Sequence, residues 1–172
     1  MIKRLATAIL AVMLLSAAGW YGWQLGPWAD TATQEYGVPI DFASLERKPS
    51  PNQYLIAPDG ATPRAEPDAE SPVFAVPPER LRDAFLAVTS EAPRTKLLNQ
   101  SADGLRLSLV QRSALLRFPD YIDVSILPAA VDGDGSTIAI YSRSRFGYSD
   151  LGVNRKRVED WMAALRTKAA SR

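Results

Sequence analysis

The chain has 172 residues, a formal net charge of +1, and neither cysteine nor histidine. These absences exclude disulfides, thiolate chemistry, histidine-containing zinc sites, and serine–histidine or cysteine–histidine nucleophile pairs. Carboxylate-only calcium or magnesium sites stay open on composition, but we expect neither a metal ion nor a cofactor. The near-neutral charge gives no bias toward nucleic acid, which we do not expect as a partner.

The sequence of residues 1–29 predicts a signal-anchor transmembrane helix. Lys3 and Arg4 precede an uncharged run from Leu5 to Trp28. At about 1.5 Å per helical residue, this run reaches roughly 36 Å, enough to cross a hydrocarbon core of about 30 Å. The two cations predict a cytoplasmic N-terminus and an exported remainder. Four aromatic residues predict an anchor at the far membrane interface: Trp20, Tyr21, Trp23 and Trp28.

The same run also fits a cleaved secretory signal. Its apolar region would be Leu5 to Ala18, with the small residues for cleavage at Ser16 to Ala18. The aromatic belt that follows favours the uncleaved anchor. Both interpretations export the residues beyond about 30. In a two-membrane bacterium we therefore expect a single-pass inner-membrane protein with its C-terminal domain in the periplasm.

Residues 30–72 predict a tether. Most of the 13 prolines fall between Pro27 and Pro78, interspersed with Asp, Glu and Gly. Proline fixes φ, so we expect an extended, semi-stiff and largely irregular segment. Isolated apolar side chains could dock it onto the folded part: Tyr36, Phe42, Leu45, Tyr54 and Leu55.

Residues 73–172 predict a globular domain. It begins with a short strand, Val73 to Val76, and a helix opened by Pro77-Pro78, whose buried stripe would contain Leu81, Ala84, Phe85 and Val88. Four half-buried strands follow, over 95–100, 105–116, 121–127 and 137–146. Alternation directs Leu105, Leu107, Leu109, Ile122, Val124, Ile126, Ile138 and Ile140 toward the core.

A C-terminal helix would cover this sheet. Its apolar arc contains Leu151, Val158, Trp161, Met162 and Leu165. Short turns, including one at residues 132–135, indicate antiparallel neighbours. We therefore predict the α+β class: a transmembrane helix, a proline-rich tether, and a two-layer domain of antiparallel sheet covered by two helices.

The outer face of the sheet carries charge. Alternation places Tyr141, Arg143 and Arg145 there, together with Tyr121 and Asp123 of the preceding strand. An exposed ion pair between Asp123 and Arg143, contributing a few tenths of a kcal/mol, is the simplest interpretation.

The join between the last strand and the last helix is the candidate site. Ser149 or Asp150 would cap the helix, and Gly147 and Gly152 would serve the backbone geometry of the turn. Asn154 falls within the apolar arc, where a buried amide must find hydrogen-bond partners.

An alternative makes this join an anion site. Arg143, Arg145, Asn154 and Arg155, together with the free N–H groups of the helix start, could bind a carboxylate or phosphate group. Arg155-Lys156-Arg157 could also be a patch for a membrane surface or nucleic acid, although three cations at a helix end are more often simply solvated.

These residues resemble a known family. Arg117-Phe-Pro-Asp-Tyr-Ile-Asp123, Ser142-Arg-Ser-Arg145, Gly147, Asp150-Leu-Gly152 and Asn154-Arg-Lys-Arg157 are similar to the signature of the family called domain of unknown function 1499. The resemblance covers about Pro49 to Leu165. It implies an exported or membrane-attached domain, and it assigns no catalytic role to any residue. Members often carry a cysteine where this chain has Gln53 and Tyr54, and an arginine where it has Tyr141.

Two functions are therefore predicted. The first is a membrane-anchored periplasmic module without catalysis, which binds another membrane or periplasmic protein as an accessory subunit of an inner-membrane complex. The second is binding of a small anionic ligand at the arginine-rich turn. A hydrolase using Asp120 and Asp123 is a distant third, because neighbouring carboxylates alone are not a mechanism.

Overall fold

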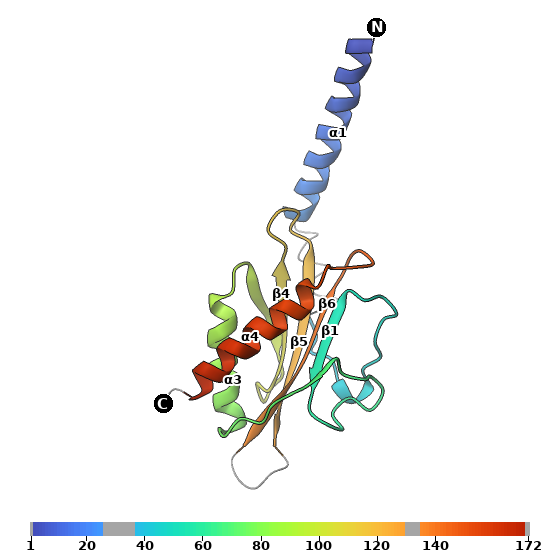
Figure 1. Cartoon of the computed structure of the whole chain (residues 1–172). Coiled ribbons are helices and arrows are strands. Elements are labelled where there is room, and N and C mark those ends of the chain that lie inside the picture. Colours follow the sequence, from blue (N-terminus) through green and yellow to red (C-terminus); the bar gives the residue numbers. More distant parts are fainter. Residues whose placement is uncertain (1, 26–36, 130–134, 171–172) are drawn as a thin grey trace.

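The computed structural model describes residues 2–25, 37–129 and 135–170, with the side chains of 2–8 and 23–25 left out. Trp28 and most of the turn predicted at 132–135 lie outside the described residues, as does the side chain of Trp23. Figure 1 shows one sheet flanked by helices, with α1 extending away from it.

Among the described residues, six strands form a single mixed sheet in the order β2-β1-β6-β5-β4-β3. The strands are β1 (Gln53–Ala57), β2 (Ala69–Glu70), β3 (Thr95–Gln100), β4 (Arg106–Arg112), β5 (Pro119–Pro128) and β6 (Ser136–Ser144). Strands β3 to β6 pair antiparallel, as predicted. Strand β1, which was not predicted, also pairs antiparallel with β6, whereas β1 and β2 are parallel. The predicted purely antiparallel sheet is corrected to a mixed one by this short edge pair.

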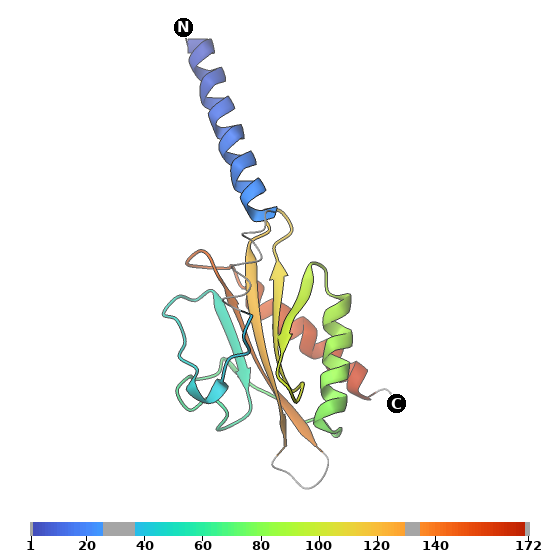
Figure 2. The ribbon, with the colours of Figure 1, turned by 180° about the vertical axis from the view of Figure 1, so that it is seen from behind.

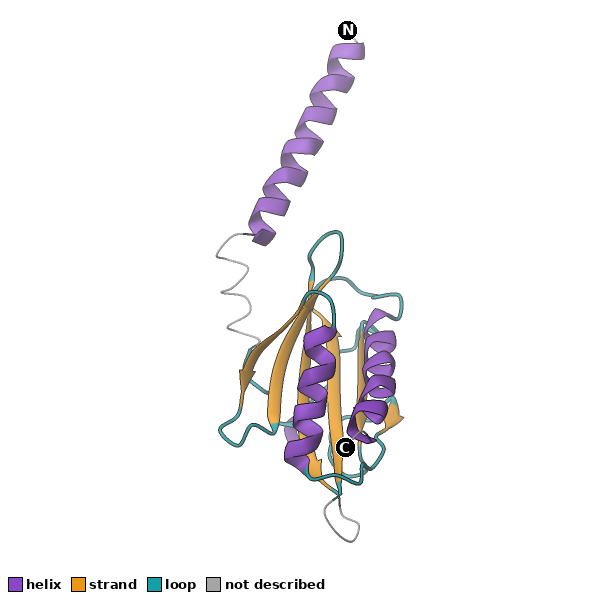
Figure 3. Cartoon of the chain, turned by 90° about the vertical axis from the view of Figure 1, so that its left-hand side faces the viewer, coloured by secondary structure: helices purple, strands orange, loops and turns teal. Residues whose placement is uncertain are grey.

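Two helices, α3 (Pro78–Glu91) and α4 (Val153–Ala170), pack on one face of the sheet, as Figure 3 shows. The core between them confirms most of the predicted inward residues: Leu81, Phe85, Val88, Leu107, Leu109, Ile122, Val124, Ile126, Ile138, Ile140, Val158, Trp161, Met162 and Leu165. Leu151 is an exception, since it is 95% exposed in the turn before α4. The two-layer arrangement was thus readable from alternation and helical spacing.

The opposite face is partly covered by residues 37–72, the described part of the segment that was predicted to be a tether. A short 3₁₀ helix, η1 (Phe42–Ser44), is capped by Asp41, whose carboxylate accepts a hydrogen bond from the N–H of Ala43. A second buried cluster forms beneath this segment: Phe42, Leu45, Leu55, Ala57, Ala65, Ala139 and Tyr141. The prediction of a largely irregular tether through residue 72 is therefore wrong for this part.

Strand β1 explains the correction. All five of its residues are buried, and it pairs with β6 from Gln53↔Arg143 to Ile56↔Ile140. The sequence did not indicate this strand for two reasons. The residues around it are rich in proline, and a strand that is buried on both faces lacks the alternation of apolar and polar residues. The segment predicted as a first strand, Val73 to Val76, instead makes only an isolated bridge between Phe74 and Ser136 among the described residues.

Helix α1 (Ile2–Leu25) is continuous, as predicted. Figures 1 and 2 show that it leaves the domain at the end where the β4–β5 loop lies. The ring of Trp20 meets the ring of Phe118 edge-on, with centroids 6.1 Å apart. Within the described residues, no helix combines the length and the apolarity that crossing a membrane requires.

Candidate functional site

The turn between β6 and α4 is shaped by three residues with positive φ: Gly147 (85°), Leu151 (54°) and Gly152 (81°). Asp150 caps the helix, as predicted. Its Oδ1 accepts from the N–H of Gly152 at 3.1 Å, and its Oδ2 accepts from the N–H of Asn154 at 2.8 Å. Ser149 Oγ accepts from the N–H of Leu151 at 3.3 Å. Both predicted capping side chains therefore stabilise the turn.

Asn154 is fully buried and joins four segments. Its amide nitrogen donates to Asp150 Oδ2 at 2.7 Å, to Ser144 Oγ at 2.9 Å and to the carbonyl oxygen of Asn52 at 3.1 Å. Its amide oxygen accepts from Ser142 Oγ at 2.7 Å. The expectation that this amide tethers the turn to neighbouring strands is confirmed, and the partners leave it no capacity for a ligand.

Arg157 is the centre of the same network. Its guanidinium donates to Asp120 Oδ2 at 2.5 Å, Gln111 Oε1 at 2.5 Å, Asn154 Oδ1 at 2.6 Å and Ser142 Oγ at 2.8 Å. Only 4% of the Arg157 side chain is exposed. We name Asp120, Asn154 and Arg157, with the Gln111, Ser142, Ser144 and Asp150 side chains that they contact, the helix-clamp network.

The interpretation of Arg157 as part of a solvated patch is wrong. Its position was readable from spacing, because it lies three residues after Asn154 and four before Trp161, within the arc that faces the sheet. The treatment of Arg155-Lys156-Arg157 as a single solvated patch overlooked that Arg157 is buried while its two neighbours are exposed. Lys156 does point outward, where it pairs with Asp160 at 2.8 Å.

The other face of the sheet holds a second buried charge pair. Arg143 Nη1 donates to Asp123 Oδ2 at 2.5 Å, and Ser108 Oγ donates to Asp123 Oδ1 at 2.6 Å. The pairing of Asp123 with Arg143 agrees with the predicted face, but Asp123 is only 1% exposed. The expected exposed pair is corrected to a buried one, since the segment before β1 covers part of this face. Losing one partner would leave an uncompensated buried charge.

Burial also perturbs the groups beside Arg143. The hydroxyl of Tyr141 donates to Gln53 Oε1, and burial raises the pKa of Tyr141 although the nearby Arg143 charge opposes the rise. Burial, followed by repulsion from Arg143, lowers the pKa of Lys48. The guanidinium carbon of Arg143 lies 4.9 Å from the Tyr141 ring centroid. Gln53, Tyr141 and Arg143 therefore pack together on this face, and Lys48 lies at its exposed margin.

The four residues of the predicted anion site are not brought together. Arg143 and Asn154 lie on opposite faces of the sheet, each engaged as described above. The Arg145 guanidinium carbon lies 5.2 Å from the ring centroid of Phe146. Arg155 is exposed and pairs with Glu159 at 2.8 Å.

Arg155 does line a surface groove of about 450 Å³ beside Tyr54, but Asp68 and Asp150 line the same groove. Burial is the main cause that raises the pKa of Tyr54, and its ring centroid lies 5.9 Å from the Arg155 guanidinium carbon. Two carboxylates in this groove make it a poor receptor for an anion. Asp120 and Asp123 likewise pair with different arginines from opposite faces of the sheet, so they form no acid–base dyad.

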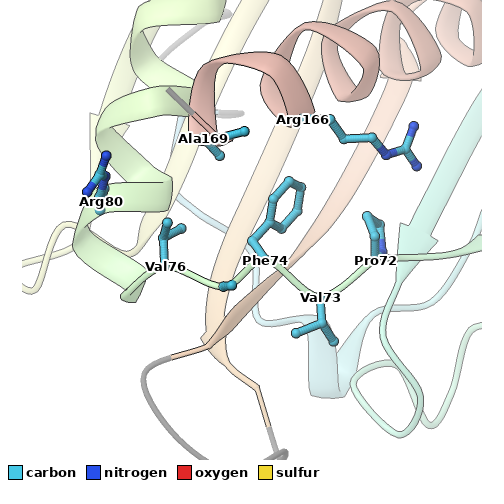
Figure 4. A pocket seen from close by; sticks show the side chains of 9 residues that line it. Pro72, Val73, Phe74, Val76, Arg80, Arg166 and Ala169 are labelled. Atoms are coloured by element: carbon cyan, nitrogen blue, oxygen red, sulfur yellow. The ribbon is translucent and has the colours of Figure 1, made fainter. Parts of the chain in front are cut away.

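A larger groove, of about 510 Å³, lies at the far end of α4. Figure 4 shows Phe74 and Val76 pointing toward the end of α4 that carries Ala169. Arg80 and Arg166 also line this groove, and Val73 is 58% exposed. The surface combines an apolar floor with cations at its rim. Its residues come from two segments far apart in sequence, 72–80 and 166–170, so no local sequence pattern predicted the groove.

Comparisons with known proteins give one family. A model described as "Protein of unknown function (DUF1499)" matches residues 44–165, which confirms the predicted resemblance. No curated protein matches the chain. A crystal structure of TTHA0849 from Thermus thermophilus is similar at 13% identity, covering 58% of this chain and 90% of that one, with a TM-score of 0.28. A TM-score this low carries no argument about fold or function.

Proposed function

The chain belongs to the DUF1499 family, and from that premise we propose that it is a membrane-anchored, exported module that binds a partner protein and has no catalysis of its own. The observation that carries this proposal is the helix-clamp network. It uses the family-motif side chains Asp150, Asn154 and Arg157 to hold α4 on the sheet. Among the described residues, no buried polar side-chain atom lacks a hydrogen-bond partner. The motif therefore supports a scaffold rather than a reaction.

Helix α1 is the proposed membrane anchor. The uncharged run of the sequence, Leu5 to Trp28, is longer than the part of α1 whose side chains the structure describes, residues 9–22. Within that part, large apolar side chains are exposed, including Leu15 at 73% and Val12 at 63%. A lipid environment would remove this apolar surface from water. In a two-membrane bacterium, Lys3 and Arg4 favour a periplasmic domain.

The groove at the end of α4 is the proposed partner site. Its apolar floor fits an aliphatic or aromatic side chain, and the rim cations Arg80 and Arg166 favour acidic groups beside it. We therefore propose an acidic, apolar-anchored segment of another membrane or periplasmic protein as the occupant, with this chain acting as an accessory subunit.

Purification of the native protein from membranes in mild detergent tests this proposal. We expect a stoichiometric membrane protein to copurify with the wild type and to be lost in Arg166→Glu, which reverses a rim charge. The matched control is Lys156→Glu, which reverses an exposed charge on the same helix outside the groove. A chain that purifies alone, or a partner retained equally by both variants, contradicts the proposal.

The alternative, a small anionic ligand at the β6–α4 turn, has weaker support because its four residues are separated and engaged. Its test is Arg145→Lys, which keeps the charge and removes the guanidinium fork. A gain in thermal stability with organic anions that the variant loses would favour the alternative. Equal behaviour of the two proteins would favour partner binding.

A further inference from the structure

The loop between β4 and β5, residues 113–118, exposes two leucines at its tip. Leu115 is 80% exposed and Leu116 is 45% exposed. Arg112 precedes the loop, and Arg117 lies within it, directly after the two leucines. An exposed leucine pair between cations is typical of a segment that contacts a membrane interface, where apolar tips enter the acyl boundary and cations remain among the headgroups.

This loop lies at the end of the domain from which α1 extends (Figures 1 and 2). Phe118 at the loop base contacts both Trp20 of α1 and Phe146 of the β6–α4 turn, with centroid separations of 6.1 and 5.8 Å. Phe146 and Tyr148 are 44% and 76% exposed. Trp20, Phe118 and Phe146 therefore form an aromatic cluster at the base of the loop that carries the two leucines.

A basic pocket of about 270 Å³ adjoins the loop. Its lining includes four cations: Arg94, Lys96, Arg112 and Arg117. The described lining contains no acidic residue. Arg94 Nε donates to the carbonyl oxygen of Arg112, and Arg112 Nη1 donates to that of Arg117, each at 3.0 Å. These bonds to backbone oxygens help to position the guanidinium groups.

We propose that this end of the domain is a second membrane contact, in which the 113–118 loop enters the interface and the basic pocket receives phosphate-bearing anionic lipid headgroups. The inference rests on the proposed membrane anchor, which would hold the loop beside the bilayer. The charge of the pocket complements a phosphodiester, and arginine recognises its oxygens in a bidentate manner. Anionic lipid is favoured over an acidic protein because the leucine tip, the aromatic cluster and α1 share one end of the domain.

A fluorescent probe on the loop tests the contact, because the chain contains no native cysteine. The full-length Leu116→Cys variant would carry a polarity-sensitive fluorophore and be reconstituted in phosphatidylglycerol-containing vesicles. We expect its emission to move to shorter wavelength and to be quenched by brominated lipid tails. The control is Asp59→Cys, an exposed position after β1 at the opposite end of the sheet. It should show neither change.

Charge removal tests the pocket. In the labelled protein, Lys96→Gln and Arg117→Gln should each lower the ratio of embedded to exposed probe by about fivefold on anionic vesicles. On phosphatidylcholine vesicles they should have little effect. Arg64→Gln, at an exposed position outside the pocket, is the matched control. Thermal midpoints of all variants check that the fold is intact.

The outcomes separate the two proposals. If the protein floats with vesicles but the Leu116 probe behaves like the Asp59 probe, the loop contact is overturned and the anchor stands. The headgroup pocket is overturned if the probe embeds equally in neutral and in anionic vesicles, and if the charge variants embed as well as the labelled protein without those substitutions. If the full-length protein fails to float, the anchor fails, and this inference fails with it.

Discussion

Arg157 and Asp120 form a buried ion pair whose stability depends on its surroundings. Gln111, Ser142 and Asn154 accept hydrogen bonds from three further N–H groups of the guanidinium, and these bonds compensate part of the desolvation of its charge. A buried pair of this kind contributes little relative to apolar residues but is costly to break from one side. Its role at the residue scale is to specify how α4 meets the sheet.

Replacement of Arg157 by methionine tests this role. The change leaves the Asp120 carboxylate buried and uncompensated, so the free energy of unfolding should fall by about 3–5 kcal/mol. In the Arg157→Met, Asp120→Leu double variant the loss should be well below the sum of the single losses. Arg155→Ala, at an exposed position, should change stability by less than about 0.5 kcal/mol. Urea unfolding measures all four, and additive losses would contradict a coupled pair.

Tyr141 gives a pH prediction. Burial raises the pKa of its hydroxyl in the folded state above the ordinary value of about 10. Between the unfolded and folded pKa values, the unfolded state loses its proton first, so the folded state is progressively destabilised. The stabilisation is complete below about pH 10 and is lost as pH rises toward the folded pKa.

Denaturant unfolding between pH 9 and 11 checks this sign. The decline in unfolding free energy should be shallower in Tyr141→Phe than in the wild type, even though the variant loses its hydrogen bond to Gln53. Tyr148→Phe, at a 76% exposed position, should keep the wild-type slope. Identical slopes in all three proteins would show that Tyr141 does not contribute.

At the scale of elements, α4 is held by an apolar stripe and a polar end. The Trp161 ring packs edge-on against Phe85 of α3, with centroids 5.9 Å apart, while the helix-clamp network secures the first turns. Trp161→Ala should therefore cost about 3–5 kcal/mol, because it removes the contact between the two helices and leaves a cavity. Leu151→Ala is the control, since this residue is exposed outside the helix. Calorimetry measures both, and similar midpoints would contradict the assignment.

Across the whole molecule, residues 37–72 are part of the fold. Strand β1 pairs with β6 and covers one of its edges, and the 3₁₀ helix with the segment around it buries Leu55, Ala139 and Tyr141. A domain without this segment would expose both an unpaired strand edge and an apolar face.

Truncation tests this integration. A fragment of residues 37–172 should unfold cooperatively, whereas a fragment of residues 73–172, the domain boundary predicted from proline content, should aggregate or unfold without a sharp transition. Circular dichroism melts and size-exclusion chromatography measure the outcome. Cooperative folding of the shorter fragment would show that β1 is dispensable.

The local periodicity of the sequence by itself determined the helix-covered core and the cap of the last helix. The alternation of Ile122, Val124 and Ile126 and the helical spacing of Val158, Trp161 and Leu165 depend only on which residues share a face, so the helix-covered core was predictable. Asp150 was predictable as a cap for the same reason, since capping acts within one turn.

Tertiary structure decided what depends on contacts across the chain. The burial of Asp123 with Arg143, the partners of Asn154 and the membership of β1 in the sheet require segments far apart in sequence to meet. Sequence spacing places a side chain on a face, but it does not say what covers that face. The cover buried the pair of Asp123 and Arg143, which was expected to be exposed. The different environments of Arg143, Arg145 and Arg155 in the fold likewise separated arginines that lie close together in sequence.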